Sequence, residues 1–187
     1  GSGRTRQRGE FSCREAGATR GGRDAAEWRM HELPAANGQS TARALARLMS
    51  DNADGGKLEN KRFISSETLE ALTRERVCGP DKVLPFDLSW GAGVMRNTHG
   101  GFYGPEPAAI GHSGWGGSCA MADPVRGLSA AYVMNRQKHH LAGDPRPPRF
   151  IDSLSLCLSS TALSHLFRPA DGARVVFPRR IASRPTS

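Results

Sequence analysis

Residues 110–135 read IGHSGWGGSCAMADPVRGLSAAYVMN, and this stretch decides the fold class. Its apolar residues come in short runs that Gly, Asp and Pro interrupt about every ten residues, which is typical of antiparallel strands. Asp123-Pro124 followed by Gly127 is a hairpin turn signal. With the similar stretch DLSWGAGVM before it, the predicted strands are 87–95, 108–114, 117–124 and 127–135.

Helical periodicity flanks these strands. Apolar residues recur at helical spacing after a polar start at 37–40, which predicts a helix over about 40–52 that Gly55-Gly56 closes. A second helix is predicted to begin at Ser65 or Ser66 and to end near Gly79, and a third covers 150–158. The predicted fold class is therefore α+β, an antiparallel sheet with packed helices.

The positive charge of the chain lies at its ends. The net charge is +8, but residues 1–29 carry seven arginines against four acidic residues and residues 159–187 carry five against one. The middle, with 14 basic and 13 acidic residues, is nearly neutral. We therefore predict three parts: a basic disordered tail over 1–29, a domain over 30–158 and a second basic tail over 159–187.

This distribution argues against nucleic acid as the main partner, although arginine-rich ends can bind polyanions weakly. The four cysteines are far apart, without the paired spacing of zinc ligands, so we predict no metal site and no cofactor. No apolar run approaches the roughly 18 residues of a membrane span, and the N-terminus lacks the apolar segment of a signal peptide. These features favour a soluble, cytoplasmic protein that does not bind membranes.

The segment GHSGWGGS at 111–118 is the candidate functional motif. A nucleophile elbow would centre on Ser113 and require glycine at position 115, where the sequence has Trp115. A phosphate loop would need a different glycine spacing and a following helix. Neither motif fits this segment.

Several segments in the same order give the chain a family resemblance. LPAANGQSTARALARLMSDNADGGKLENKRFISSETLEAL, SWGAGVM, the stretch 110–135 and the last helix resemble the C-terminal part of the serine β-lactamase-related proteins. That group contains class C β-lactamases, D,D-peptidases and esterases. The resemblance covers about residues 30–158 and implies a partial β-lactamase/transpeptidase-like fold.

The resemblance also implies roles for four residues. His112-Ser113-Gly114 is similar to the third motif of the family in its His-x-Gly form. His112 would face the substrate or the catalytic tyrosine, Ser113 would hydrogen-bond the substrate, and Gly114 would keep the strand edge bare for substrate. The backbone N–H of Trp115 would be one of two oxyanion-hole donors.

Two alternatives stay open for this motif. Trp115-Gly116-Gly117 spells the Trp-Gly-Gly form that some esterase relatives use. We prefer the His-x-Gly register because the glycine before His112 and the hairpin after it fit that register. A structural strand histidine without a catalytic part is the competing interpretation of His112.

The chain departs from the family in one large respect. None of its serines is followed by lysine three positions later, so the Ser-x-x-Lys nucleophile motif is absent from these 187 residues. Tyr132 is followed by Asn135 at the wrong spacing for the tyrosine motif, and we predict that it packs in the sheet. Ser50-Asp51-Asn52 spells a class A motif, which we interpret as the end of a helix.

These observations predict a fragment or divergent member of a serine hydrolase family that is inactive alone. Its full-length relative would cleave a small ester, amide or β-lactam substrate through an acyl-enzyme. The alternative is a non-catalytic scaffold that keeps part of the fold. A fragment would leave a sheet edge or a helix face uncovered, and we expect self-association through such a surface.

Overall fold

The computed structural model describes residues 26, 30–32, 34, 38–59, 61–97, 101–136, 138, 140, 143–159 and 174–176. Two compact units divide the chain, Gly1–Ser40 and Thr41–Ser187. All the elements described below lie in the second unit. Within the described ranges, no helix has both the length and the apolar content needed to cross a bilayer.

Helix α3 (Ala42–Ala53) confirms the first predicted helix. The side chain of Thr41 caps it by accepting a hydrogen bond from the Ala44 N–H at 3.2 Å. Gly55 and Gly56 follow with φ of 61° and 89°, a left-handed conformation that glycine adopts without strain. A Cβ on Gly56 would collide with the backbone of Ile64, so the turn requires glycine for a second reason.

The region after α3 differs from the prediction at its end. A two-stranded hairpin, β1 (Lys57–Leu58) and β2 (Lys61–Arg62), leads to helix α4 (Ser66–Thr73), which Ser65 caps. The sequence predicts that this helix continues to near Gly79, but residues Val77–Pro80 form strand β3 instead. Val77 pairs with Trp90 of the next strand, so a partner distant in the sequence decides this conformation.

Seven strands form the main sheet, in the order β3-β4-β5-β6-β7-β8-β9. All neighbours are antiparallel except β8 and β9, which run parallel. The predicted strand 87–95 is two strands with a turn between them, and β9 is a strand that the sequence analysis does not predict. After β3, the strands are β4 (Asp87–Trp90), β5 (Met95–Arg96), β6 (Ile110–Ser113), β7 (Cys119–Asp123), β8 (Leu128–Tyr132) and β9 (Arg174–Val176).

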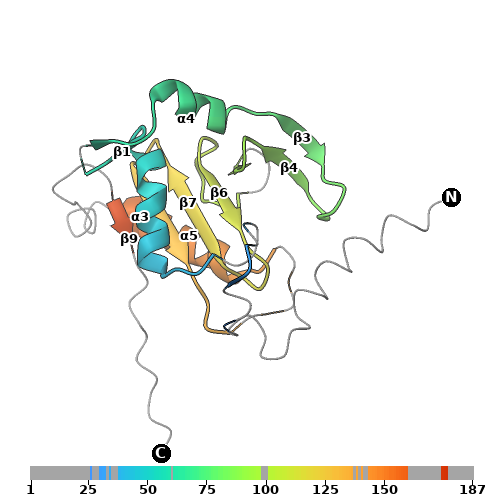
Figure 1. Cartoon of the computed structure of the whole chain (residues 1–187). Coiled ribbons are helices and arrows are strands. Elements are labelled where there is room, and N and C mark those ends of the chain that lie inside the picture. Colours follow the sequence, from blue (N-terminus) through green and yellow to red (C-terminus); the bar gives the residue numbers. More distant parts are fainter. Residues whose placement is uncertain are drawn as a thin grey trace, which may run out of the picture. The chain divides into compact units, whose positions relative to one another are not determined.

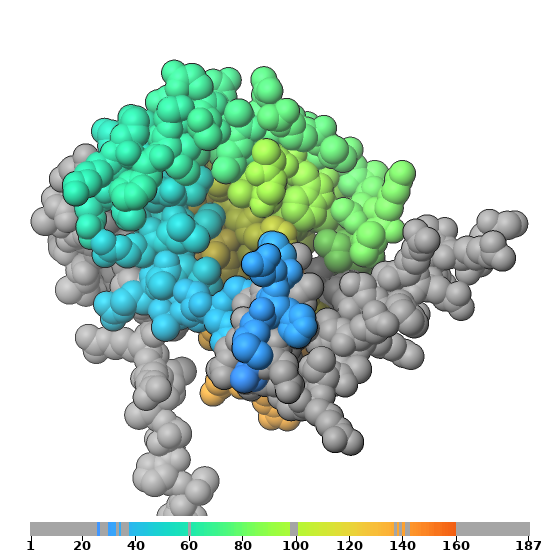
Figure 2. Space-filling model, in the orientation of Figure 1, coloured from blue at the N-terminus to red at the C-terminus, as the bar shows by residue number. Residues whose placement is uncertain are grey.

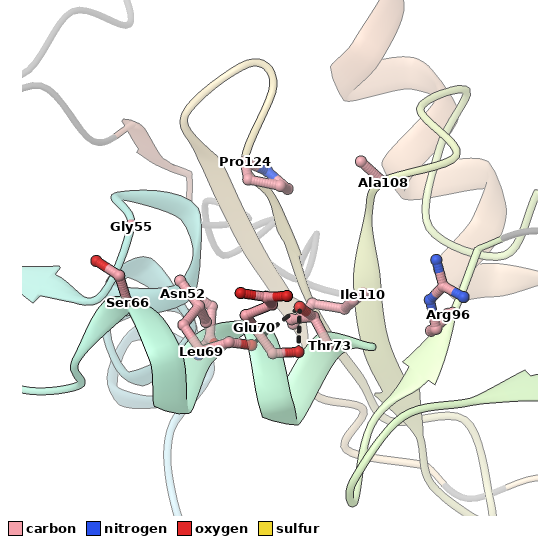
Figure 3. A pocket seen from close by; sticks show the side chains of 10 residues that line it. All are labelled: Asn52, Gly55, Ser66, Leu69, Glu70, Thr73, Arg96, Ala108, Ile110 and Pro124. Atoms are coloured by element: carbon pink, nitrogen blue, oxygen red, sulfur yellow. Dashed lines mark hydrogen bonds between the residues drawn. The ribbon is translucent and has the colours of Figure 1, made fainter. Parts of the chain in front are cut away.

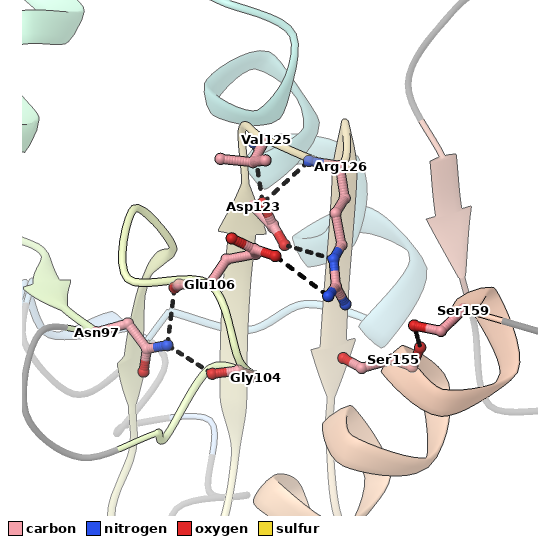
Figure 4. A network of polar contacts seen from close by, with 8 residues as sticks. All are labelled: Asn97, Gly104, Glu106, Asp123, Val125, Arg126, Ser155 and Ser159. Atoms are coloured by element: carbon pink, nitrogen blue, oxygen red, sulfur yellow. Dashed lines mark hydrogen bonds and ion pairs between the residues drawn. The ribbon is translucent and has the colours of Figure 1, made fainter.

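The predicted hairpin between β7 and β8 is confirmed. Asp123 pairs with Leu128, and its carboxylate accepts hydrogen bonds from the N–H groups of Val125 and Arg126 at 2.9 and 3.1 Å. Arg126 reaches on to Glu106, with 3.1 Å between their charged atoms. Figure 4 shows this ion pair, and it also shows the side-chain amide of Asn97 donating to the Glu106 carbonyl. The ion pair connects the loop before β6 to the β7–β8 turn.

The sheet is covered on both faces by helices (Figure 1). Alternate residues of each strand point to opposite faces, which splits the core in two. On one face Ala53 of α3 packs against Ile110 and Ala122. On the other face α5 (Arg146–Ser159) meets a larger cluster that contains Tyr103, Met121, Leu128, Ile151 and Leu154. The α+β architecture predicted from the sequence is confirmed.

Gly111 of β6 lies in close contact with Tyr103 of this second cluster. A Cβ on Gly111 would lie 2.6 Å from the Ala120 carbonyl oxygen and 2.7 Å from the Tyr103 ring. Neither neighbour can move away, because Ala120 is part of the sheet backbone and Tyr103 is fully buried. The strand therefore requires glycine at this position.

Gly111→Ala is expected to lower the free energy of unfolding by about 1–3 kcal/mol through overpacking. Urea unfolding followed by circular dichroism measures this change. Gly38→Ala is the matched control, because a Cβ there meets nothing within 4 Å. Equal stability of the two variants would contradict the proposed close packing at Gly111.

Candidate functional site

The candidate site forms where β6 extends beyond one of its neighbours. On one side β6 pairs with β7 over all four of its residues, Ile110–Ser113. On the other side its ladder with β5 contains only Ile110 and Gly111. His112 and Ser113 therefore continue past the end of β5. A strand edge left outside a ladder can offer its backbone N–H and C=O groups to another extended segment.

His112 carries the exposed side chain at this end of β6. Its ring lies beside Trp90, with 5.7 Å between ring centroids and 50° between the planes. The Trp90 indole N–H in turn donates to the Asp81 carboxylate at 3.3 Å. The Nδ1 atom of His112 lies 3.1 Å from the Ser113 carbonyl oxygen. When Nδ1 holds the proton, it donates to that carbonyl and leaves Nε2 as an acceptor for a proton.

Ser113 points to the opposite face from His112, as alternation along a strand requires. Its Oγ lies 3.4 Å from the hydroxyl of Tyr103, which also lies 3.2 Å from the sulfur of Met95. Burial raises the pKa of Tyr103 above its ordinary value and raises the pKa of the neighbouring Cys119 to about 12. Both groups therefore stay protonated at neutral pH, and neither is a base for Ser113. The substrate hydrogen bond that the sequence analysis expects from Ser113 stays a prediction.

The turn after β6 brings Trp115 next to this strand end. The Gly114 N–H donates to the Ser118 carbonyl at 2.8 Å, and the Gly117 N–H donates to the Gly114 carbonyl at 3.2 Å. A Cβ on Gly114 would meet the Ser118 hydroxyl, which would have to rotate away. Trp115 is half-buried within this tight turn.

A pocket of about 470 Å³ lies between α4 and the other end of β6 (Figure 3). Figure 3 shows Glu70 and Thr73 of α4 facing Ile110. Ile110 is two residues before His112, so both side chains lie on the same face of β6. The lining residues are Asn52, Gly55, Ser66, Leu69, Glu70, Thr73, Arg96, Ala108, Ile110 and Pro124. In the space-filling view, the residues of the sheet lie deeper than the residues of α3 and α4 around them (Figure 2).

The sequence analysis does not predict this pocket. Apolar side chains, among them Leu69 and Ile110, line it together with the charged side chains of Glu70 and Arg96. Arg96 is also paired with Glu75 at 3.1 Å. The only sequence signal was the alternation that puts Ile110 and His112 on one face. The helix that closes the pocket comes from about 40 residues earlier in the chain, a contact that no local pattern encodes.

The other residues that the sequence analysis considered lie elsewhere. Ser50-Asp51-Asn52 forms part of the last turn of α3, as predicted. Tyr132 ends β8 and packs beside the Phe150 ring, with 6.1 Å between centroids, which confirms its packing role. The described part of the chain holds no group of three or more His, Cys, Asp or Glu side chains that could bind a metal ion.

Comparison with known proteins supplies a family and two solved folds. The family model described as Beta-lactamase matches residues 3–150, a span that begins within the basic N-terminal stretch. A curated protein of Mycobacterium tuberculosis (strain ATCC 25618 / H37Rv), "Esterase/beta-lactamase LipL", is 42% identical over 106 residues. The match covers 56% of this chain and 24% of that protein.

The solved structures agree with the sequence match. A penicillin-binding protein homolog from Caulobacter crescentus has a TM-score of 0.69 and 54% identity, over 72% of this chain and 36% of that chain. A family VIII carboxylesterase has a TM-score of 0.65 and 38% identity, over 71% of this chain and 36% of that chain. The chain thus spans about a quarter of the curated relative and just over a third of each solved structure.

The burial of Cys119 at the start of β7 leads to a prediction about thiol chemistry. With its pKa raised to about 12, Cys119 is a protonated thiol at pH 8, and alkylation requires the thiolate. Iodoacetamide at pH 8 is expected to label the exposed Cys78 at least about tenfold faster than Cys119. Peptide mass spectrometry measures both rates. In denaturing urea the two rates should become similar, and equal rates in the folded protein would contradict the buried position of Cys119.

Proposed function

Since the chain belongs to the beta-lactamase family, we propose that the end of β6 forms one wall of an acyl-transfer site for ester or amide substrates. The observation that carries this proposal is the extension of β6 past β5. It leaves His112 exposed at a free strand edge, with the Trp115 turn directly after it. This is the arrangement that a third motif of the His-x-Gly form needs.

The chemistry follows from these positions. A serine hydroxyl would attack the carbonyl carbon of the substrate, pass its proton to a base, and form a tetrahedral oxyanion. The Trp115 N–H would donate to that oxyanion, and removal of one such donor typically costs about 2.7–4 kcal/mol. The leaving alcohol or amine would then take a proton, and water would hydrolyse the acyl-enzyme.

The nucleophile would come from outside these 187 residues. No serine in the sequence has lysine three positions later, and Ser113 faces the buried side of β6. Tyr132 packs against Phe150 and does not supply the tyrosine motif. The chain alone is therefore half of a site, and we expect it to be inactive.

The substrate class that we propose is an ester with an apolar group. His112 stands where a lysine would favour a penicillin carboxylate, and two of the relatives are described as an esterase/beta-lactamase and a carboxylesterase. The pocket on the His112 face of β6 has apolar lining residues, such as Leu69 and Ile110, that can contact a hydrocarbon group of such a substrate.

The test combines the full chain with the part of the Caulobacter crescentus homolog that the match does not cover. The 54% identity of the matched part favours docking of the two polypeptides. Neither polypeptide alone should hydrolyse p-nitrophenyl butyrate or nitrocefin, and the mixture should hydrolyse at least the ester. His112→Ala should lower this rate by about 10²-fold or more, because it removes a group placed at the reacting centre.

Arg149→Ala is the control for this experiment, because Arg149 is exposed on α5, on the other face of the sheet. It should leave the rate unchanged. Turnover by the chain alone, or an unchanged rate after His112→Ala, would contradict the proposal. A mixture that forms a complex without turnover would favour the non-catalytic scaffold instead.

A further inference from the structure

Arg146, at the start of α5, joins three parts of the chain that are distant in sequence. Its Nη2 donates to the Gly116 carbonyl at 2.8 Å, across 30 positions of sequence. Its Nη1 donates to the Arg136 carbonyl at 2.9 Å. Its Nε and Nη2 also bind the carboxylate of Asp144, at 2.9 and 2.6 Å. One guanidinium thus connects the β6–β7 turn, the segment after β8 and the start of α5.

Asp144 orients this guanidinium. Its side chain is only 5% exposed, and it also accepts the backbone N–H of Arg146 at 3.0 Å. Hydrogen bonds from Arg146 lower the pKa of Asp144 to about 2, so the carboxylate is charged at neutral pH. A planar guanidinium held on one side by a carboxylate presents its remaining N–H groups in fixed directions.

The turn is shaped to fit this pair. A Cβ on Gly117, where φ is 109°, would lie 2.5 Å from the Asp144 carboxylate and 2.6 Å from the Arg146 guanidinium. Gly116, next to it, donates its N–H to the His140 carbonyl at 3.0 Å while its own carbonyl accepts from Arg146. Gly116 is therefore held by Arg146 and by the backbone of Lys138 and His140, and Gly117 lies against Asp144 and Arg146.

We propose that Arg146 is a positioning residue that fixes the turn Gly114–Ser118 and, with it, the direction of the Trp115 N–H. The anchor is rigid because α5 is held on the sheet by the buried Ile151 and Leu154. The consequence for acyl transfer rests on the function proposed above. The effect on the turn does not, and it is measurable in the chain itself.

Amide hydrogen exchange of Arg146→Lys tests this inference. Lysine keeps the positive charge beside Asp144 but cannot direct N–H groups to the Gly116 and Arg136 carbonyls together. The amides of Gly114, Gly116 and Gly117 should exchange at least about tenfold faster, because the turn opens locally. The amides of Met121 and Ala130, inside the β7–β8 ladder, should keep their wild-type rates.

Arg149→Lys is the matched control, three residues along the same helix with an exposed side chain, and it should leave all these rates unchanged. The inference is overturned if Arg146→Lys behaves like Arg149→Lys. It is also overturned if all amides speed up together, because that pattern means that Arg146 only stabilises the whole fold. Should Arg146→Lys fail to fold, Asp144→Asn replaces it, with the same local acceleration expected and the same two patterns counting against the inference.

The exchange pattern and the ester assay can fail separately. Local opening of the turn in Arg146→Lys, with no turnover in the two-polypeptide mixture, would leave the positioning role intact and remove the proposed function. Turnover in the mixture, with no local opening of the turn in Arg146→Lys, would leave the proposed function intact and remove the positioning role.

Discussion

The unequal pairing of β6 is the constraint on which the candidate site depends. β7 pairs with the whole of Ile110–Ser113, whereas the ladder with β5 ends at Gly111. Full pairing on one side keeps the strand straight and in register, and the short neighbour on the other side leaves the last two residues at an edge. A longer β5 would bury this edge in the sheet, and a shorter β7 would leave it without support.

The two faces of β6 differ: one packs in the core, and the other carries the exposed side chain of His112. Gly111 and Ser113 face Tyr103 and the core beneath α5, where there is no room for larger groups. Ile110 and His112 face the other way, beside the pocket under α4 and beside Trp90. Ser113, which looks most like a nucleophile in the sequence, is thus on the packed face, and the imidazole of His112 is on the exposed face.

The proposal of half an acyl-transfer site agrees with the part of the family fold that this chain spans. Relatives of the matched region are about three to four times longer than the part that this chain covers. The strand, its turn and the arginine that holds the turn are all present in the chain. No Ser-x-x-Lys motif occurs in the 187 residues, so in the function that we propose these features would place and polarise a substrate carbonyl, and another segment would supply the attacking serine.

The sequence alone determined those features that depend on neighbouring residues. Ser65 caps the second helix through its own side chain, and Asp123 closes its hairpin through hydrogen bonds from the next residues. Periodicity predicted the first helix, although its cap is Thr41 and not one of the polar residues at 37–40. The family resemblance of 110–135 identified the same segment as the candidate site.

Tertiary structure decided everything that needed a partner from far along the chain. Val77–Pro80 is a strand because β4 pairs with it, although the sequence analysis extends the second helix to near Gly79. Tyr103 meets the Ser113 hydroxyl across ten positions of sequence, and Arg146 reaches Gly116 across 30 positions. Periodicity and capping act over a few residues, whereas these contacts exist only after the sheet has brought distant segments together, and for that physical reason the sequence could not specify them alone.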